Sequence, residues 1–380
     1  MNILVTGASG FVGSSYIRRM RERARLEKPP HPNPLPKGEG LDFFRRGSAP
    51  SGPSRAGLEG VAPSRKIEAL PHGERVWEWG PLLHGIGRRR LDDPSYSSID
   101  LTQPFELDFD ADVVIHAAAR ASPWGTRDDY QRQNVDATRH VIDWCLRRQR
   151  PRPPRLVYVS SSSVFYRDGD QRGITEDSAI GPVFVNDYAA TKHAGELLVR
   201  DYPGEWTIVR PRAVFGPGDT VLFPRILAAA QRGRLPIIDT GDPPAIGDLI
   251  YIDTLSDYLH AAATSPHAVG RAFNLTNNQP VAILPFLLDV FDRLGIARPS
   301  RRVSLRTAMR AARVSEAVYR LLRLSGEPPI TRFGVGVFAW SKTFDVSRAV
   351  AAFGPPSVTL ERGIDRFVAW QKAQWQRRSS

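Results

Sequence analysis

Short apolar runs alternate with longer amphipathic stretches along the N-terminal part of the chain. Asn2–Thr6 reads as a buried strand, and a helix begins near Gly10 and continues to Leu26. Further strands are predicted at Leu82–Ile86, Asp112–His116, Arg155–Ser160 and Thr207–Arg210, and helices at Asn134–Arg147 and Tyr188–Arg200. Strands that alternate with helices in this way are typical of an α/β fold, with a parallel sheet covered on both faces.

The alternation breaks over residues 29–64, which hold a dense scatter of proline, glycine and serine, including the run Pro29–Pro36. Proline removes backbone donors and glycine adds backbone entropy, so we predict a disordered insertion over residues 27–80. After Gly218 the alternation becomes irregular. This change predicts two domains, residues 1–218 and a smaller lobe over residues 219–380, with some segments of the lobe returning to the first domain.

The formal net charge of +12 raises the question of a nucleic-acid partner. Much of the excess falls between Arg18 and Arg90, and a second basic block runs from Arg301 to Arg323. Neither block interleaves aromatic with basic residues, so we expect no nucleic-acid partner. A single cysteine, the absence of an apolar run near the ~20 residues of a membrane span, and an N-terminus without a signal-peptide pattern predict a cytoplasmic protein.

The basic segment over residues 301–324 has the pattern of an amphipathic helix. Its apolar residues near one face are Leu305, Met309, Ala312, Val318 and Leu322. We interpret it mainly as a helix of the lobe that packs over the substrate pocket and exposes its arginines to solvent. The alternative is a peripheral contact with an anionic membrane surface.

A glycine-rich turn lies between the first strand and the first helix. Its glycines permit a tight turn and a close approach of the backbone to a pyrophosphate, and the helix N-terminus supplies amides for the phosphates. The position of the turn directly after an N-terminal strand predicts a dinucleotide site. The residues assigned to it are Gly7, Ser9, Gly10, Phe11, Val12 and Gly13.

A tyrosine and a lysine, Tyr188 and Lys192, stand four residues apart on a predicted helix and therefore share one face. An ammonium group close to a phenol favours the phenolate and lowers the pKa of the phenol, which suits proton exchange near neutral pH. The serine run Ser160–Ser163 lies at the carboxyl end of a predicted parallel strand, where such sheets bind ligands. One of these hydroxyls is placed to hold a substrate oxygen beside Tyr188. No metal site is predicted.

With these features, the chain resembles the extended short-chain dehydrogenases/reductases of the NAD-dependent epimerase/dehydratase group. The motifs that carry the resemblance are Gly7/Gly10/Gly13, Ile99–Leu101, His116–Ala119, Asn134–Asp136, Ser161/Tyr188/Lys192 and Arg210–Gly218. They cover nearly the whole chain apart from residues 27–80. The resemblance implies a Rossmann-type doubly wound parallel sheet with a smaller, mostly helical C-terminal substrate lobe.

The family's pattern also implies roles for these residues. Tyr188 would be the general acid/base, Lys192 would tune it and hold the nicotinamide ribose, and Ser161 would position the substrate oxygen. Further cofactor contacts are implied for Asp100 and Leu101 at the adenine, for Ala117, Ala118, Ala119 and Asn134, and for Pro211 and Val214 at the nicotinamide end. A homodimer is a further expectation of the family.

The end of the second predicted strand bears on the choice of cofactor. It runs into Gly87 and then Arg88, Arg89 and Arg90, with no carboxylate before Asp92. NAD sites place an acidic side chain there for the ribose hydroxyls, whereas arginine suits a 2′-phosphate. We therefore predict binding of NADP through Arg88 and Arg89, with NAD as the alternative.

Two motifs in the C-terminal part favour a hydrophobic small-molecule substrate. Nucleotide-sugar epimerases typically carry an arginine where this chain has Gly247, so the expected anchor for a diphosphate is missing. The segment Lys342–Ala349 resembles the 3β-hydroxysteroid dehydrogenase-like branch. Aromatic residues that suit a hydrophobic substrate are Phe165, Phe184, Phe215, Phe223 and Trp340, although such residues usually belong to the core.

These observations predict an oxidoreductase that interconverts a secondary alcohol and a ketone on a steroid-like or β-hydroxy/β-keto acid-like molecule. The alternatives are a nucleotide-sugar epimerase or dehydratase with bound NAD, and a non-catalytic dinucleotide-binding regulator. The intact Ser161/Tyr188/Lys192 set argues against the regulator, because a sensor has no need of a tuned phenol.

Overall fold

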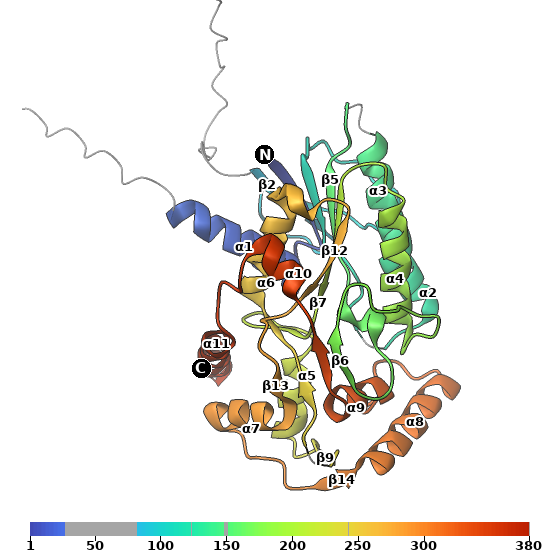
Figure 1. The fold of residues 1–380 in the computed structure, drawn as a ribbon, viewed down its shortest axis with the longest axis vertical. Helices are drawn as coiled ribbons and strands as arrows, with labels where there is room; N and C mark the ends of the chain where they lie inside the picture. The colour runs from blue at the N-terminus through green and yellow to red at the C-terminus, as the bar shows by residue number, and fades with distance from the viewer. Residues whose placement is uncertain (27–81, 123, 148–150, 242, 380) are drawn as a thin grey trace, which may run out of the picture.

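The computed structural model describes residues 1–26, 82–122, 124–147, 151–241 and 243–379 (Figure 1). Their centre is a parallel seven-stranded sheet with the order β12-β7-β5-β4-β1-β2-β3. Its strands are β1 (Asn2–Thr6), β2 (Leu82–Gly87), β3 (Tyr96–Ser98), β4 (Val113–His116), β5 (Arg155–Val159), β7 (Trp206–Pro211) and β12 (Arg271–Leu275). The chain leaves β1 toward β2 and β3 and then returns to β4, so the switch point where such sheets bind ligands lies between β1 and β4.

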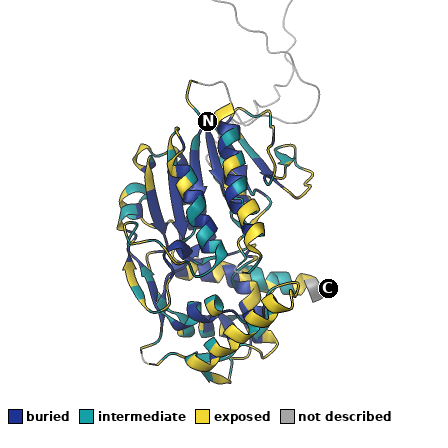
Figure 2. Ribbon diagram, turned by 90° about the vertical axis from the view of Figure 1, so that its right-hand side faces the viewer, coloured by how far each residue is buried: buried dark blue, intermediate teal, exposed yellow. Residues whose placement is uncertain are grey.

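Helices cover both faces of this sheet (Figure 1). One face carries α1 (Phe11–Leu26), α6 (Ile252–Thr264) and α10 (Ser347–Phe353). The other carries α2 (Arg127–Tyr130), the π-helical turn η1 (Gln131–Asp136), α3 (Ala137–Arg147) and α4 (Asp187–Arg200). Alternate residues of a strand point to opposite faces, so Ile3 and Val5 pack in one core while Leu4 packs in the other. Figure 2 shows these strands buried between exposed outer helix faces.

The remaining elements form the lower half of the molecule in Figure 1 and short connections to the sheet. The helices among these elements are the 3-10 turn η2 (Ser162–Phe165), α5 (Phe223–Gln231), η3 (Pro266–Ala268) between α6 and β12, α7 (Ile283–Leu294), α8 (Leu305–Leu321), α9 (Arg332–Ala339) and α11 (Leu360–Ser379). The strands among them are β6 (Gln171–Ile174), β8 (Val214–Phe215), β9 (Ile237–Asp239), β10 (Ile246–Gly247), β11 (Ile250–Tyr251), β13 (Val281–Ala282), β14 (Arg302–Ser304) and β15 (Lys342–Phe344).

The predicted Rossmann-type architecture is confirmed, with differences in detail. The helix expected from Asn134 begins with the π-helical turn, and α3 proper starts at Ala137. A four-stranded sheet, in the order β13-β10-β15-β6, joins β6 of the predicted first domain to three strands of the C-terminal part, and the irregular sequence pattern did not predict it. Its strands are two to four residues long, too short for a period-2 pattern to stand out. The predicted insertion over residues 27–80 lies outside the described residues.

The apolar face predicted for the basic helix is only half correct. Ala308 and Ala312 of α8 are buried against α9, β9 and β14, together with Leu305 and Met309. Val318 and Leu322 were expected on the same buried face, but they are 41% and 61% exposed. The neighbouring elements cover the apolar residues in the N-terminal half of the helix, whereas the apolar residues near its C-terminal end are exposed to solvent.

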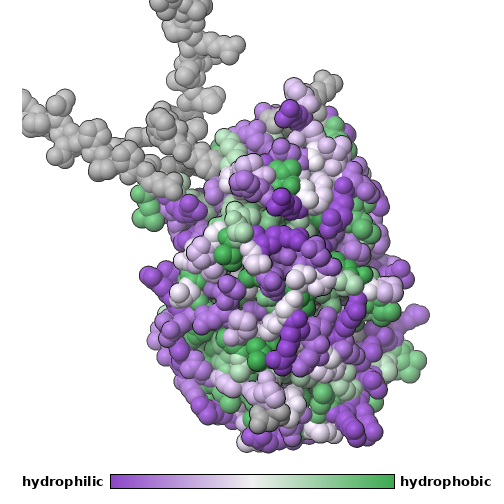
Figure 3. All heavy atoms as spheres, in the orientation of Figure 1, coloured by the Kyte–Doolittle hydropathy of each residue, from purple (hydrophilic) through white to green (hydrophobic). Residues whose placement is uncertain are grey.

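Figure 3 shows mainly hydrophilic residues on the face turned to the viewer, with hydrophobic residues in small scattered groups. One such group lies at the right-hand edge, where α8 ends in Figure 1. Of the helices in the described ranges, none combines the length and apolar character that a membrane crossing requires. The expected membrane contact, homodimer and cytoplasmic location stay predictions.

Candidate active site

The four consecutive serines after β5 differ in burial. Ser160, Ser162 and Ser163 are 3–4% exposed, whereas Ser161 is only partly buried. Ser161 caps η2, and its hydroxyl accepts hydrogen bonds from the Ser163 amide at 3.2 Å and the Ser163 hydroxyl at 2.9 Å. The structure therefore leaves the Ser161 hydroxyl as the one in this run that faces accessible space.

Tyr188 lies in the first turn of α4, a helix capped by the Asn186 side chain, which accepts from the Ala189 amide at 2.9 Å. The phenol meets Ser161 in a hydrogen bond that lowers its pKa, but burial has the larger effect and raises the pKa of Tyr188. The Tyr130 ring stands 6.4 Å from the Tyr188 ring. Ser161 is therefore the serine of the run that acts on the Tyr188 phenol, and the catalytic roles of both residues stay predictions.

The expected electrostatic effect of Lys192 on Tyr188 is wrong for this arrangement. Lys192 is 1% exposed and its Nζ lies 4.1 Å from the centre of the Tyr158 ring. Burial lowers the pKa of Lys192 to about 7, while Glu196 acts in the opposite direction. Because desolvation of the phenol dominates, the pKa of Tyr188 is raised rather than lowered.

A buried ion pair lies one helical turn beyond Lys192. Glu196 accepts from Arg210 at 2.9 Å and 2.6 Å in a two-point contact, and both side chains are at most 1% exposed. The Ser160 hydroxyl donates to the same carboxylate at 2.5 Å. The pair therefore ties α4 to β5 and β7 directly behind the candidate catalytic residues. Sequence reasoning missed Glu196, although its spacing four residues after Lys192 placed it on the same helix face.

The π-helical turn connects the candidate cofactor loop to α4. The Asn134 side chain accepts from the Arg120 amide at 2.7 Å and donates to the Thr191 hydroxyl at 3.1 Å. Asn134 is 1% exposed, so it holds the loop after β4 against the helix that carries Tyr188. This contact gives the predicted residue Asn134 a positioning role.

The glycine turn has the shape that a dinucleotide site requires. Gly7 has φ +68°, and a Cβ on it would lie 2.7 Å from the Ala118 amide nitrogen. A Cβ on Gly13 would lie 2.5 Å from the Gly7 carbonyl oxygen. The turn therefore packs closely against the alanine run after β4, and α1 begins immediately after Gly10 with its amides free for an anion. These residues fit a nicotinamide dinucleotide.

The remaining predicted cofactor residues lie around the carboxyl edge of the sheet. Arg88 and Arg89 follow β2 and are exposed, and Arg88 donates to the Gln133 side chain at 3.2 Å. Asp100 is exposed, whereas Leu101 is buried and its carbonyl lies 2.9 Å from the His140 ring. Elsewhere on this edge, Pro211 ends β7 and Val214 begins β8.

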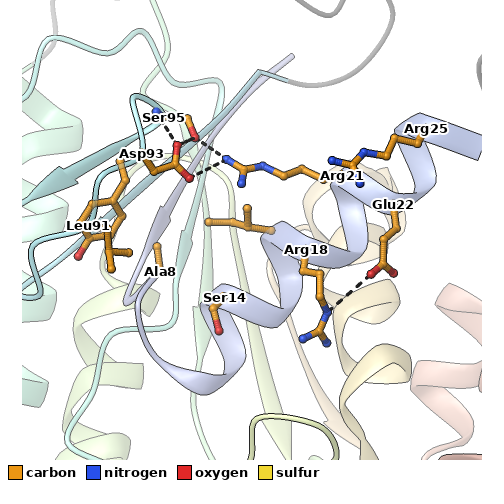
Figure 4. A pocket seen from close by; sticks show the side chains of 11 residues that line it. Ala8, Ser14, Arg18, Arg21, Glu22, Arg25, Leu91, Asp93 and Ser95 are labelled. Atoms are coloured by element: carbon orange, nitrogen blue, oxygen red, sulfur yellow. Dashed lines mark hydrogen bonds and ion pairs between the residues drawn. The ribbon is translucent and has the colours of Figure 1, made fainter. Parts of the chain in front are cut away.

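A cavity of about 350 Å³ lies between α1 and the β2–β3 edge of the sheet (Figure 4). Ala8 of the glycine turn lines it, but Ser161, Tyr188 and Lys192 do not. Arg21 lies 3.2 Å from Asp93 and Arg18 lies 3.8 Å from Glu22, and Arg25 lines the cavity as well. The lining thus holds three arginines against two carboxylates.

The aromatic residues expected near a hydrophobic substrate divide into two groups. Phe165, Phe215 and Phe223 are at most 1% exposed and belong to the core. Phe184 and Trp340 are only partly buried. Burial of the first group follows from their packing against lobe residues such as Phe367, 4.5 Å from the Phe223 ring.

Comparison with known proteins agrees with this geometry. The profile of the NAD dependent epimerase/dehydratase family matches residues 67–276, more than half of the chain. The chain belongs to this family. The resemblance predicted from the motifs is confirmed, and the family consists of nicotinamide-dependent enzymes with a Rossmann fold.

Individual relatives cover nearly the whole chain. The 2-alkyl-3-oxoalkanoate reductase of Stenotrophomonas maltophilia is 30% identical over 97% of this chain and 99% of its own. The sterol-4-alpha-carboxylate 3-dehydrogenase, decarboxylating, of Schizosaccharomyces pombe is 29% identical over 98% of both chains. Among solved structures, MoeE5 in complex with UDP-glucose and NAD superposes with a TM-score of 0.63 at 19% identity, over 99% of this chain and all of that one.

Proposed function

We propose that this protein interconverts a secondary alcohol and a ketone on a hydrophobic β-hydroxy or β-keto acid, with NADP as the preferred hydride carrier. The observation that carries the proposal is the contact of the partly buried Tyr188 phenol with Ser161, at the carboxyl end of β5. Carboxyl ends of parallel strands are where such sheets hold their ligands.

The protein's own contribution is to hold and move one proton. Burial raises the pKa of Tyr188, so the phenol stays protonated near neutral pH and is suited to donate to a carbonyl oxygen during reduction. Ser161 would hold the same carbonyl oxygen beside the Tyr188 phenol. The bound dinucleotide supplies the hydride in this direction and accepts it in the other. The glycine turn and Lys192 would hold that dinucleotide.

The relatives support the substrate class. One is named for 2-alkyl-3-oxoalkanoates and another for sterol-4-alpha-carboxylates oxidised at position 3. Both names describe an apolar molecule with a carboxylate β to the reacting carbon. The partly buried Phe184 and Trp340 suit the apolar part of such a molecule.

The end of β2 supports NADP over NAD. A Cβ on Gly87 would lie 3.0 Å from the Ser9 hydroxyl, so this strand end approaches the glycine turn without a carboxylate between them. Asp93, a nearby carboxylate, is engaged by Arg21 and Ser95. Arg88 and Arg89 remain exposed beside this edge, as a 2′-phosphate would require.

A nucleotide-sugar epimerase or dehydratase remains the rival within the family. Gly247 is buried, and a Cβ there would lie 3.1 Å from the Ile283 side chain. An arginine for a diphosphate would have to displace Ile283, and this crowding disfavours the rival.

The test is a direct assay of the full chain. Oxidation of a 2-alkyl-3-hydroxyalkanoic acid with NADP or NAD should raise the absorbance of the reduced cofactor, and UDP-glucose should give no epimerised or dehydrated product. Turnover of the nucleotide sugar, with none of the hydroxy acid, would reverse the proposal.

A further inference from the structure

Arg212 is a buried cation whose side chain makes no hydrogen bond or ion pair among the described residues. It directly follows the end of β7 and its side chain is 6% exposed. Its guanidinium donates no hydrogen bond and forms no ion pair within the described ranges, and its Nε is shut off from solvent. Desolvation has the largest effect on Arg212 and lowers its pKa, while Tyr166 and Asp248 act in the opposite direction.

Two further buried polar atoms in this region also lack a hydrogen-bond partner. The hydroxyl of Tyr166 and Oδ1 of Asp248 are both buried without a hydrogen-bond partner, in residues that are 4% and 2% exposed. Arg212 and Asp248 lie side by side, because each stands two residues before the paired residues Val214 of β8 and Ile250 of β11. Tyr166 and Asp248 both act electrostatically on Arg212 and raise its pKa. Buried polar atoms are nearly always hydrogen-bonded, and three orphans in one cluster indicate a missing polar partner.

The neighbouring Lys342 does not share this property. Its ammonium donates to the carbonyls of Arg167 and Gly169 at 2.6 Å and 2.5 Å, and to the Gln171 side chain at 2.7 Å. All three of its donors are used within the loop before β6. Arg212 is therefore the cation of this region that retains its hydrogen-bonding capacity.

The cluster adjoins the candidate catalytic residues along the chain. Ser161 immediately precedes η2 and Tyr166 immediately follows it. At a rise of about 2.0 Å per residue, the Cα atoms of these two residues lie roughly 10 Å apart. In the chain, only the four residues of η2 separate Tyr166 of this cluster from Ser161.

We propose that Arg212, together with the Tyr166 hydroxyl, binds the carboxylate of the substrate. This inference rests on the proposed function and assigns the residues that recognise the acid group. The planar guanidinium fork matches a carboxylate at two points, and the phenol supplies a further donor. Asp248 opposes the incoming anion, so it limits affinity for the acid rather than contributing to it.

The first experiment compares Arg212→Gln with wild type on a 2-alkyl-3-hydroxyalkanoic acid and its methyl ester, in the presence of NADP. Loss of charge-assisted hydrogen bonds should lower kcat/KM for the acid by about 10- to 100-fold. The ester should change by no more than about twofold, and NADPH affinity should stay the same. Arg234→Gln, which removes an exposed arginine, is the control for net charge.

The second experiment measures acid binding without turnover, by calorimetry on the enzyme saturated with NADPH. Arg212→Gln and Tyr166→Phe should weaken binding, and Asp248→Asn should tighten it, because the amide removes the repulsion and keeps an acceptor for the Phe344 amide now held at 2.8 Å. The melting temperature of each variant is measured alongside, because Arg212→Gln leaves the neighbouring carboxylate of Asp248 buried.

These measurements separate the inference from the proposed function. Acid binding that depends on Arg212 without any oxidation would retain the carboxylate site and reject the reaction. Equal losses for acid and ester, or a drop in melting temperature with unchanged acid affinity, would show a structural Arg212 and overturn the inference. If Arg120→Gln, and not Arg212→Gln, lowered kcat/KM for the acid but not for the ester, the carboxylate would be bound at the loop after β4.

Discussion

Two arginines leave the end of β7 two positions apart and have opposite surroundings. Arg210 meets a two-point carboxylate from Glu196, its guanidinium lies 4.8 Å from the Phe165 ring, and the Ser160 hydroxyl completes the network. Arg212 is nearly as deeply buried, yet its guanidinium has no hydrogen bond within the described chain. Burial alone therefore does not distinguish a structural from a functional charge.

The two arginines differ in which group accepts the hydrogen bonds of the guanidinium. A buried cation with its full set of acceptors is satisfied by the fold, and it serves to hold α4, β5 and β7 in register behind the site. A buried cation without acceptors costs free energy in the empty protein, and that cost is recovered when an anion binds. The four predictions below test the Glu196–Arg210 ion pair, the candidate proton donor Tyr188, the exposed arginines that follow β2, and the exposed end of α8.

The largest effect is expected from Glu196→Gln, which leaves Arg210 buried without a counter-charge. Breaking a buried pair in this way should reduce the free energy of unfolding by about 3–5 kcal/mol, measured by urea denaturation. Replacing both partners, as Glu196→Leu with Arg210→Met, should recover much of the loss.

Glu205→Gln is the matched control, because its pair with Arg155 is 2.6 Å long but Glu205 is 51% exposed. Its cost should stay below about 1 kcal/mol. If Glu196→Gln were no more costly than this control, the Glu196–Arg210 pair would lose its structural role and the contrast with Arg212 would fail.

Tyr188→Phe removes the transferable proton and keeps the ring, so turnover should fall by about 100-fold or more with cofactor binding intact. Steady-state kinetics and fluorescence titration with NADPH measure the two quantities. Tyr130→Phe, at the neighbouring ring 6.4 Å away, should reduce turnover by no more than about threefold. A Tyr188→Phe variant that keeps over half of wild-type turnover would remove Tyr188 from the mechanism.

Arg88→Ala with Arg89→Ala tests two exposed arginines. Because solvent screens these charges, NADPH affinity should fall by only about 3- to 10-fold, and NADH affinity should not change. Titration with both cofactors provides the comparison within one protein. Equal weakening of both, or none, would make NAD the better assignment.

The smallest effect is expected at the exposed end of α8. Val318, Leu321 and Leu322 are 41%, 83% and 61% exposed, and arginines flank them. Changing the three to Glu should reduce co-sedimentation with phosphatidylglycerol vesicles by a few-fold. Leu197→Glu, on the 50% exposed leucine of α4, is the control. Sedimentation equal to that of wild type would remove the membrane contact from consideration.

Sequence patterns were reliable where the information is local. Short apolar runs located the strands β1, β4, β5 and β7, and the longer amphipathic stretch located the helix α4, to within one or two residues. The glycine turn was recognised because its conformation depends on a few adjacent residues, as φ +68° at Gly7 illustrates. The tyrosine and lysine were found because their spacing places them on one helix face.

The sequence by itself thus determined the sheet, the glycine turn and the identity of the candidate acid. Only the tertiary structure decided which of four serines is accessible, which of Arg210 and Arg212 is hydrogen-bonded to a carboxylate, and that burial raises the pKa of Tyr188. It also decided that the end of α8 stays uncovered. The physical reason is that burial and partnership depend on residues far apart in the chain, such as Glu196 for Arg210 and Asp248 for Arg212, and no local pattern encodes their approach.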